Sequence, residues 1–286
     1  MISDINWFPG HMAKTRRLIG EQLKLVDAVV IVLDARIPIS SMNPETEQLT
    51  AGKPRIVIFN KADLADKKRT QEWVAYYKER GIACLPANCK TGEGLKNFRR
   101  TVREVLSDVI KKNTDKGMPG KPLRLMVLGI PNTGKSTFIN RMYGGSKAKT
   151  EDRAGVTRSN QWYIIGGGIE LLDTPGVLWP KFEDPTVGER LAFTGGIRDN
   201  IVDPETLAVR FLEIMRDSYP DKITERYKIT DIENDEPFDI LEKIGRKRGL
   251  LVRGGEVDTQ RAAGIVLDEY RSGLLGRITF ESALNI

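Results

Sequence analysis

Short apolar runs alternate with amphipathic segments over the first two thirds of the chain. Residues 28–33 (AVVIVL) and 55–59 (RIVIF) are continuous apolar runs, a pattern typical of strands that are covered on both faces. The alternation predicts an α/β fold with a mostly parallel, doubly wound sheet. Further strands are predicted at 82–85 and 123–128, and a hairpin around three glycines at 161–165 and 169–172.

Helical spacing predicts the other elements. Apolar residues recur every three or four positions over 94–111, and the polar, Gly- and Pro-rich stretch 113–122 that follows is typical of a connector. After about residue 180 the strand signals stop, and helices are predicted at 204–215, 238–247 and 259–270. We therefore expect an α/β domain over 1–178, which begins with a basic segment over 1–25, and a mainly helical domain over 179–286.

The composition excludes several classes of protein. No apolar run in the 286 residues approaches the roughly 20 positions of a membrane-spanning helix, and the first residues lack the apolar centre of a signal peptide. We therefore expect no membrane span and a cytoplasmic protein. Two cysteines and one histidine are too few for a disulfide framework or a structural zinc site.

Charge is distributed unevenly along the chain. The net charge is +6, but residues 51–150 hold 22 Lys and Arg against 8 Asp and Glu, whereas the rest holds 23 against 31. Such a block either lies on solvated helix faces or attracts an anionic partner, and composition alone leaves both interpretations open.

Residues 129–136 (GIPNTGKS) match the phosphate-binding pattern G-x-x-x-x-G-K-S, between a predicted strand and a helix-forming segment. The glycines let the backbone turn tightly, so that its N–H groups and the helix N-terminus surround the phosphates. Lys135 would place a cation on the β- and γ-phosphates as a catalytic group, and the Ser136 hydroxyl would bind Mg²⁺. The residues expected to bind nucleotide in this loop are Asn132, Thr133, Gly134, Lys135, Ser136 and Thr137.

A second phosphate-sensing segment follows at 171–176 (LLDTPG). Asp173 can hold Mg²⁺ through a water molecule, and the Gly176 amide can meet the γ-phosphate. Thr157 lies between the two motifs and is a candidate second Mg²⁺ ligand with a catalytic role. The short pattern is weak alone, and its meaning depends on the phosphate-binding loop before it.

The tetrapeptide NKAD, at 60–63, indicates which base is bound. Guanine offers N1–H and an exocyclic amine to the Asp63 carboxylate, a pairing that adenine cannot reproduce. Asn60 is expected to tie the loop together, and the Lys61 stem to pack on the base. GTP is the predicted nucleotide, and an ATPase with a coincidental NKAD is an alternative.

The order of these motifs is inverted relative to Ras-like GTPases, because the base-reading motif precedes the phosphate-binding loop. With WFPGHMAK at 7–14, LDARIP at 33–38 and DTPG at 173–176, the chain resembles the circularly permuted GTPases that assist ribosome assembly. The resemblance spans essentially the whole chain, since LEKIGRKRG (241–249) and YRSGLLG (270–276) also match. It implies a circularly permuted Ras-like P-loop domain, in which 113–122 joins the old ends.

The same resemblance implies the activity and the partner. We expect GTP hydrolysis that is slow in the isolated protein, stimulated by the late large (50S) ribosomal subunit precursor and coupled to release from it. A GTP-gated RNA-binding module without relevant hydrolysis is the alternative. The resemblance also implies that backbone amides of Ala87, Asn88 and Cys89 meet the guanine oxygen, although the segment departs from the Ser-Ala-Lys form of Ras-like proteins. A turn with no ligand role is the alternative there.

The catalytic glutamine of Ras-like enzymes is missing, because Val177 follows Gly176. Asn132 is one substitute: in related GTPases with this loop form, an asparagine there is associated with a K⁺ ion, although a loop-shaping role is an alternative. His11 is the other, as the one side chain of a type that serves as a general base near neutral pH. The resemblance implies that His11 reaches the nucleotide when the ribosomal particle is bound, and a surface or capping role is the alternative.

Basic residues cluster at 243–253, after an acidic stretch at 201–242 with 12 Asp and Glu against 5 Lys and Arg. Such a cluster would bind phosphates of ribosomal RNA and so give affinity without sequence choice. Stabilisation of a helix C-terminus is the alternative. The candidate RNA contacts are Lys243, Arg246, Lys247 and Arg248.

Overall fold

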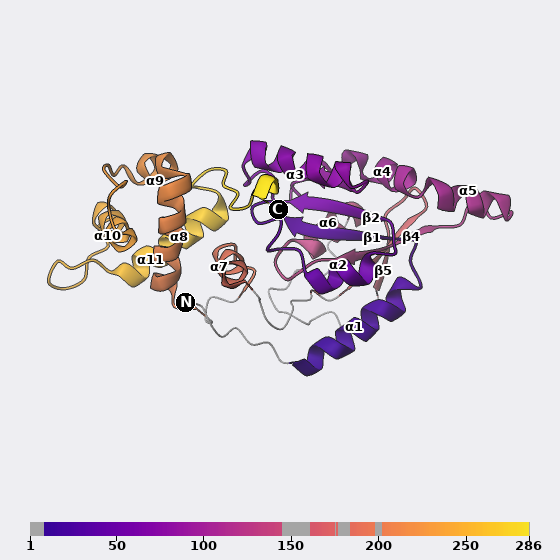
Figure 1. Ribbon diagram of the computed structural model, residues 1–286, viewed down its shortest axis with the longest axis horizontal. Coiled ribbons are helices and arrows are strands. Elements are labelled where there is room, and N and C mark those ends of the chain that lie inside the picture. Colours follow the sequence, from indigo (N-terminus) through magenta and orange to yellow (C-terminus); the bar gives the residue numbers. More distant parts are fainter. Residues whose placement is uncertain (1–8, 145–160, 175, 177–183, 198–201, 286) are drawn as a thin grey trace. The chain divides into compact units, whose positions relative to one another are not determined.

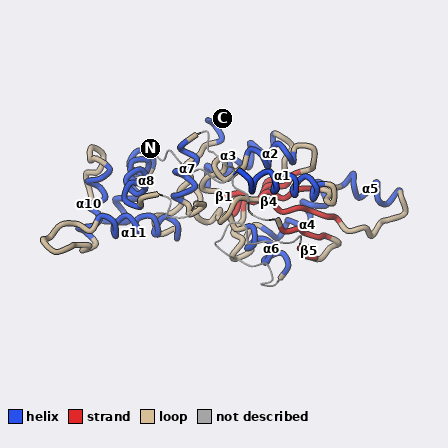
Figure 2. The backbone as a smooth tube through the Cα atoms, turned by 90° about the horizontal axis from the view of Figure 1, so that it is seen from below, coloured by secondary structure: helices blue, strands red, loops and turns tan. Residues whose placement is uncertain are grey.

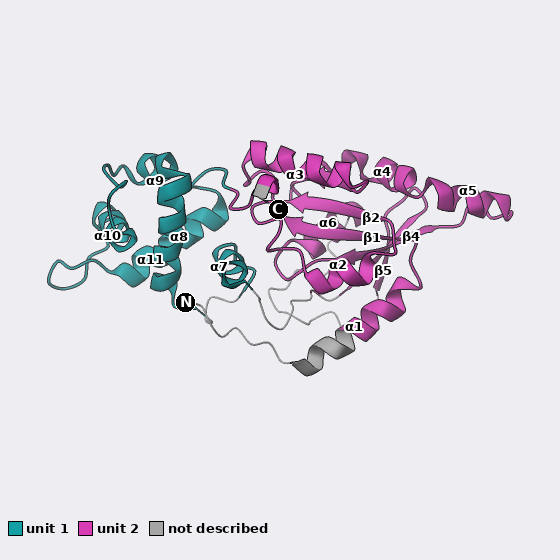
Figure 3. Ribbon diagram, viewed as in Figure 1, with its two compact units in different colours: residues 1–5, 183–278 teal, residues 6–182, 279–286 magenta. Residues whose placement is uncertain are grey.

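The computed structural model describes residues 9–144, 161–174, 176, 184–197 and 202–285, with the backbone alone for 9–15 and 285. Two compact units divide the chain (Figure 3). The sheet unit comprises residues 6–182 and 279–286, and the helical unit comprises 183–278 and 1–5. The sequence had assigned 279–286 to the helical domain. In the structure this segment packs on the sheet unit instead, because its polar residues bond to loops there.

The described strands form one six-stranded sheet in the order β3-β2-β1-β4-β6-β5 (Figure 1). Neighbouring strands are parallel, except that β5 runs antiparallel to β6. The apolar runs form the strands as predicted, and every residue of β1 is buried. The strands are β1 (Ala28–Asp34), β2 (Arg55–Asn60), β3 (Ala83–Pro86), β4 (Leu123–Leu128), β5 (Gln161–Ile164) and β6 (Ile169–Asp173).

Helices cover both faces of the sheet (Figure 2). Alternate residues of a strand point to opposite faces. Val30 packs with apolar side chains of α4 and α6, and its neighbour Ile31 packs with those of α1 and α3. The doubly wound α/β architecture is therefore confirmed. The helices of this unit are α1 (Pro9–Leu23), α2 (Pro44–Thr50), α3 (Lys67–Glu79), α4 (Phe98–Val105), α5 (Ser107–Asp115) and α6 (Lys135–Tyr143).

The segment predicted as one helix over 94–111 is interrupted. A 3₁₀ turn, η1 (Leu95–Asn97), leads into α4, and α5 begins after Leu106. Leu106 is fully buried, and its backbone (φ −104°, ψ 21°) leaves helical geometry. α5 then covers the first three residues of the predicted connector, 113–122. The rest of the connector, 116–122, leads to β4 as irregular chain.

The helical unit has an aromatic centre. The rings of Phe193 and Tyr270 lie 5.5 and 5.0 Å from the ring of Phe211. Three of its helices were predicted from their spacing, and the shorter α7 and α9 were not. No helix in the described part of the chain is long and apolar enough to cross a membrane. The helices are α7 (Pro185–Phe193), α8 (Pro204–Ser218), α9 (Pro220–Tyr227), α10 (Pro237–Lys247) and α11 (Thr259–Ser272).

Candidate nucleotide-binding site

The phosphate-binding loop, residues 129–136, turns between the end of β4 and the start of α6. Two of its glycines are required because neighbouring atoms lie too close for a side chain, and one of them also has a backbone conformation that disfavours a side chain. A Cβ on Gly129 would lie 2.8 Å from the carbonyl oxygen of Val32. Gly134 has φ +92°, and a Cβ there would lie 2.1 Å from the Asn60 side-chain nitrogen. The loop is therefore packed directly against the strands that precede it in the chain.

Side chains of the loop divide between internal support and the open face. Thr133 is buried, and its hydroxyl donates to the Ile130 carbonyl at 3.0 Å. Asn132 is exposed and lies in the left-handed region at φ +63°. Ser136 and Thr137 are half-buried in the first turn of α6. Thr133 thus shapes the loop, whereas the other three remain candidates for direct ligand contact.

Lys135 and Asp173 form a buried ion pair between the loop and the end of β6. Their side chains are 8% and 6% exposed. The lysine predicted to bind phosphate and the aspartate predicted to hold Mg²⁺ are thus adjacent. Each is the other's partner, so the two groups expected to meet phosphate and Mg²⁺ lie together at one end of the loop.

Gly176 lies against the phosphate-binding loop. A Cβ there would come within 3.2 Å of the Pro131 nitrogen and 3.4 Å of its Cα. Two residues earlier, the Thr174 hydroxyl donates to the Val127 carbonyl of β4 at 2.6 Å. The Gly176 amide therefore lies at the edge of the loop that is expected to hold the phosphates.

Asn60 joins three separate segments of the chain. Its side-chain nitrogen donates to the Thr133 carbonyl at 2.7 Å, and its side-chain oxygen accepts from the Cys89 amide at 3.0 Å. Both ends of this buried amide are thus used, one by the phosphate-binding loop and one by the loop after β3. The expected tying role of Asn60 is seen directly.

Lys61 adds a second link to the phosphate-binding loop. With φ +60°, it directs its ammonium group to the Asn132 carbonyl and to the Asp34 carboxylate, each at 2.9 Å. Burial is the main cause that lowers the pKa of Lys61, and the Asp34 carboxylate acts in the opposite direction.

Asp34 and Arg36 are the site residues whose role the sequence did not predict. The Arg36 guanidinium binds both carboxylate oxygens of Asp34, at 2.9 and 2.7 Å, and both side chains are buried. Burial alone would raise the pKa of Asp34, but Arg36 and Lys61 outweigh it and hold that pKa well below its usual value. A polar residue at the end of a buried strand was the available signal.

In the loop after β3, the backbone amides expected to meet the guanine oxygen already donate hydrogen bonds within the protein. The Ala87 amide donates to the Phe59 carbonyl at 2.8 Å, the Asn88 amide to the Glu93 carbonyl at 3.0 Å, and the Cys89 amide to Asn60. All three amides expected at the guanine oxygen thus have acceptors within the protein. Contact with the base from this loop requires one of these bonds to be shared or exchanged.

Asp63 and Cys89 lie near each other at the base side of the site. Asp63 is half-buried, and its carboxylate accepts no hydrogen bond from another described residue. Burial raises the pKa of the Cys89 thiol to about 12, against an opposing effect of Arg141 and with a smaller contribution from Asp63 in the same direction as burial. The thiol is therefore neutral, and the Asp63 carboxylate is the polar group placed to meet a base.

Comparison with known proteins agrees with this geometry. Residues 124–236 match the family model described as "50S ribosome-binding GTPase". The chain is 45% identical to ribosome biogenesis GTPase A of Bacillus cereus, over 97% of this chain and 94% of that protein. It is 46% identical to the Priestia megaterium protein of the same name, over 97% and 96%.

This chain belongs to the ribosome biogenesis GTPase A family. A solved structure described as GDP-bound YlqF is 29% identical to it, with a TM-score of 0.68 over 94% of this chain and all of the other. A structure of YlqF from Thermotoga maritima with bound GNP gives a TM-score of 0.65, over 94% and 98%. The circularly permuted GTPase fold is confirmed, and with it a GTPase that binds GTP and GDP and acts in ribosome biogenesis.

GTPases bind their nucleotide with Mg²⁺, and two predicted ligands of this family member fit that ion. Mg²⁺ prefers oxygen donors and keeps several waters. Ser136 supplies a hydroxyl at the start of α6, and the adjacent Lys135–Asp173 pair places a buried carboxylate at the same end of the loop. The other predicted ligand, Thr157, lies outside the described residues.

Two further predicted features also lie outside the described residues. His11 falls within α1, in the part where only the backbone is described, and Val177 is not described. The structure therefore gives no side-chain position for the predicted general base or for the residue that replaces the catalytic glutamine.

The candidate RNA contacts of the helical unit fall into two pairs. Lys243 is bonded to Asp235 at 2.5 Å, and Arg248 to Glu269 at 2.8 Å. Arg246 and Lys247 are exposed in the last turn of α10 and form no ion pair with another described residue. Two of the four basic groups are thus committed within the protein, and two face solvent.

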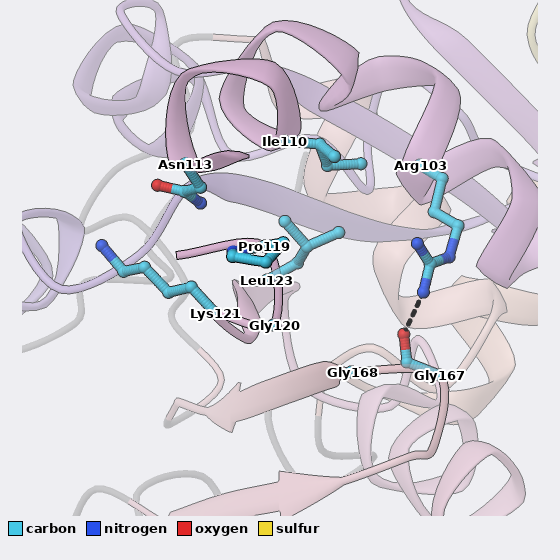
Figure 4. Close-up of a pocket in the computed structure, with 9 residues that line it drawn as sticks. All are labelled: Arg103, Ile110, Asn113, Pro119, Gly120, Lys121, Leu123, Gly167 and Gly168. Carbon is cyan, nitrogen blue, oxygen red and sulfur yellow. Dashed lines mark hydrogen bonds between the residues drawn. The ribbon is translucent and has the colours of Figure 1, made fainter. Parts of the chain in front are cut away.

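A cavity of about 150 Å³ lies at the other end of the sheet (Figure 4). Leu123, the first residue of β4, lines it, whereas the phosphate-binding loop follows the last residue of that strand. Arg103 closes one wall by donating to the Gly167 carbonyl at 2.6 Å. A six-residue strand separates the cavity from the nucleotide site by roughly 17 Å, so it is not part of that site.

Proposed function

We propose that this GTPase acts on the precursor of the large (50S) ribosomal subunit, that the particle stimulates its hydrolysis, and that hydrolysis drives release. The names of its relatives and of the matching family model support this target. The structure supports the nucleotide-binding part of the proposal through the Asn60 amide, which joins the base-reading loop to the phosphate-binding loop and so makes one nucleotide site from separate segments. Such a factor would act in the cytoplasm, where bacterial ribosomes assemble.

Nucleotide binding follows from the groups already adjacent. Lys135 would leave Asp173 for the β- and γ-phosphates, and the Gly176 amide would meet the γ-phosphate. Asp63 would accept both N–H groups of the guanine edge. The Lys61 stem would lie along the base while its ammonium group stays on the Asn132 carbonyl.

Mg²⁺, when bound, would neutralise charge on the phosphates. Ser136 would hold it directly, Asp173 through water, and Thr157 as a second protein ligand. The Asn132 side chain is exposed at the crest of the loop, where it could hold a K⁺ ion beside the phosphates. These assignments follow from residue type and from position in the motif.

Hydrolysis by the isolated protein should be slow. Val177 occupies the position after Gly176 and cannot orient a water molecule. Charge in the transition state would be stabilised by Lys135, Mg²⁺ and backbone N–H groups, without a side chain that orients the attacking water. His11 would act as the general base once the ribosomal particle fixes the N-terminal segment near the nucleotide.

RNA binding is assigned to the exposed pair Arg246 and Lys247, with Lys243 and Arg248 as neighbours that are already ion-paired. Double replacement of the exposed pair by alanine should weaken binding to purified large-subunit precursors in co-sedimentation. The slope of log affinity against log salt concentration should also fall, by roughly 0.7 to 0.9 for each lost phosphate contact. Double replacement of Lys111 and Lys112, an exposed pair on α5, is the control with the same change of charge.

The test of the target compares nucleotide states in the same sedimentation assay. We expect binding to the precursor with a non-hydrolysable GTP analogue and release with GDP. Equal binding in both states would contradict coupling to release. No binding in either state would contradict the ribosomal target.

A second function is favoured by Val177: a GTP-gated RNA-binding module in which hydrolysis has no role. The His11→Ala variant tests the catalytic role given to His11 in the first proposal. Loss of particle-stimulated hydrolysis in that variant supports the catalytic proposal, whereas an unchanged rate in the presence of particles removes His11 from the mechanism.

A further inference from the structure

Polar residues near the end of the chain are buried against the nucleotide-binding unit. Thr279, Glu281 and Ser282 are 2%, 3% and 6% exposed. They belong to the last eight residues, 279–286, here called the tail, which pack on the sheet unit. Burying three polar residues within four positions costs free energy unless each one is hydrogen-bonded. The hydrogen bonds of the tail therefore indicate its role.

Glu281 binds the loop that follows β1. Its carboxylate accepts from the Ser40 amide at 3.1 Å, and also from the Ile39 amide and the Ser40 hydroxyl. Its backbone carbonyl accepts from the Trp73 indole nitrogen at 3.1 Å. One side chain thus fixes two successive residues of the loop while its backbone is attached to α3.

Thr279 bridges two loops of the nucleotide site. Its hydroxyl accepts from the Asp66 amide at 3.0 Å and donates to the Ala35 carbonyl at 3.4 Å. The next residue, Phe280, donates its amide to the Arg36 carbonyl at 3.0 Å. Consecutive residues of the tail therefore hold both the loop after β1 and the loop after β2.

These two loops contain the base side of the site. Asp66 lies three residues after Asp63, in the loop that begins with Asn60. Ala35 follows Asp34, whose carboxylate binds the Lys61 ammonium group. The Ala35 backbone amide donates to the backbone carbonyl of Asn60 at 2.9 Å. The bonds of Thr279 and Phe280 are thus made within three residues of Asp63 or of Asp34, and Glu281 binds the loop after β1 five and six residues beyond Asp34.

We propose that Thr279 and Glu281 are positioning residues for guanine recognition. They hold the loops after β1 and β2 in one relative arrangement, so that the Asp63 carboxylate is already oriented when the base arrives. Two hydrogen bonds from guanine to one carboxylate require fixed geometry, and a loop that must be ordered on binding loses affinity by the cost of that ordering. The proposal concerns nucleotide binding by the isolated protein and does not depend on the ribosomal target.

The test uses the full chain with Thr279→Val, Glu281→Gln and Glu281→Ala. Valine keeps the shape of threonine but removes the hydroxyl bridge, and glutamine keeps an acceptor for the loop amides. Ser282→Ala is the matched control, because Ser282 is buried in the same tail but bonds to Glu72 and Leu284 rather than to either loop. The readouts are the dissociation rate of fluorescently labelled GDP and the affinity ratio of GDP to IDP, well below the unfolding temperature.

We expect Thr279→Val and Glu281→Ala to release GDP about tenfold faster and to reduce the preference for GDP over IDP, which lacks the exocyclic amine. Glu281→Gln should keep most of the parental GDP release rate and GDP-to-IDP preference, and Ser282→Ala should behave like the parent protein. The rate at saturating GTP should stay within about twofold of the parent rate in Ser282→Ala, because that change touches neither loop. Lower thermal stability with unchanged GDP release and an unchanged GDP-to-IDP ratio would overturn the proposal and leave the tail a purely structural role. If Glu281→Ala does not fold, Thr279→Val decides the question.

Discussion

At the scale of residues, the site depends on side chains that use every polar atom they have. The Asn60 amide donates with one end and accepts with the other, and Asp34 binds Arg36 and Lys61 with its two oxygens. Burying such groups costs free energy, and they stabilise the fold only when every hydrogen-bond partner is present. Single substitutions here should therefore cost more than the loss of one hydrogen bond.

Replacing Asn60 by alanine should weaken GDP binding by roughly 10- to 100-fold. The change leaves the Thr133 carbonyl and the Cys89 amide without their partner, and an unsatisfied buried group costs about 1–3 kcal/mol. Titration with fluorescently labelled GDP measures the effect. Asn97→Ala, at an exposed asparagine outside the site, is the control. An Asn60→Ala protein with parental affinity would show that the bridge between the loops is dispensable.

Asp34→Asn should destabilise the folded protein at neutral pH by about 3–5 kcal/mol, because Arg36 is left buried, and Lys61 half-buried, without their carboxylate. The pKa of Asp34 is lowered by folding from its ordinary value of 3.8, so its stabilisation is present above about pH 4 and is lost as the pH falls toward the folded-state pKa.

Urea unfolding at a series of pH values checks the sign. The difference in free energy of unfolding between parent and Asp34→Asn should stay level above about pH 4 and shrink below it. Asp108→Asn, at an exposed position in α5, should show no such gap. A gap for Asp34→Asn that is independent of pH down to pH 3 would contradict the assignment.

At the scale of elements, the predictable parts were those determined by local pattern. Continuous apolar runs predicted the parallel strands, and the base-reading motif and the phosphate-binding loop were both located at carboxyl ends of these strands. Parallel strands place such ends at one edge, and Asp34 indeed pairs in register with Asn60. The bidentate Arg36 contact and the tail bonds were not predictable, because they depend on side-chain direction and on residues more than 200 positions apart. The interruption at Leu106 was also missed, because apolar spacing is the same on both sides of it.

The turn from β3 into η1 gives a prediction at this scale. Gly94 has φ +82°, and a Cβ there would lie 2.0 Å from the Pro86 carbonyl oxygen, whereas Gly81 has φ +68° and open space around it. Gly81→Ala should cost about 1 kcal/mol of unfolding free energy from backbone conformation. Gly94→Ala should cost roughly 3 kcal/mol, since the clash with backbone adds to the same strain. Equal losses in urea unfolding would show that the turn can relax and that close approach is not required.

At the scale of the whole molecule, the chain runs from the nucleotide site into the helical unit and returns to the sheet unit at Thr279. Family membership, the fold and the nucleotide groups agree on a GTPase, whereas the amino acid after Gly176 is unsuited to catalysis. In the function proposed above, a ribosomal partner would complete the reaction. The exposed basic pair of the helical unit would bind that partner, and His11 of the N-terminal segment would supply the general base.

The central claim is tested by the rate of GTP hydrolysis with and without purified large-subunit precursors, in K⁺ and in Na⁺, for the parent protein and His11→Ala. We predict slow hydrolysis alone, an increase of at least tenfold with particles in K⁺, and loss of most of that increase in His11→Ala. Replacement of K⁺ by Na⁺ should lower the rate if Asn132 holds the ion, and an unchanged rate would remove K⁺ from the mechanism. Hydrolysis that does not respond to the particles in either salt would contradict the account.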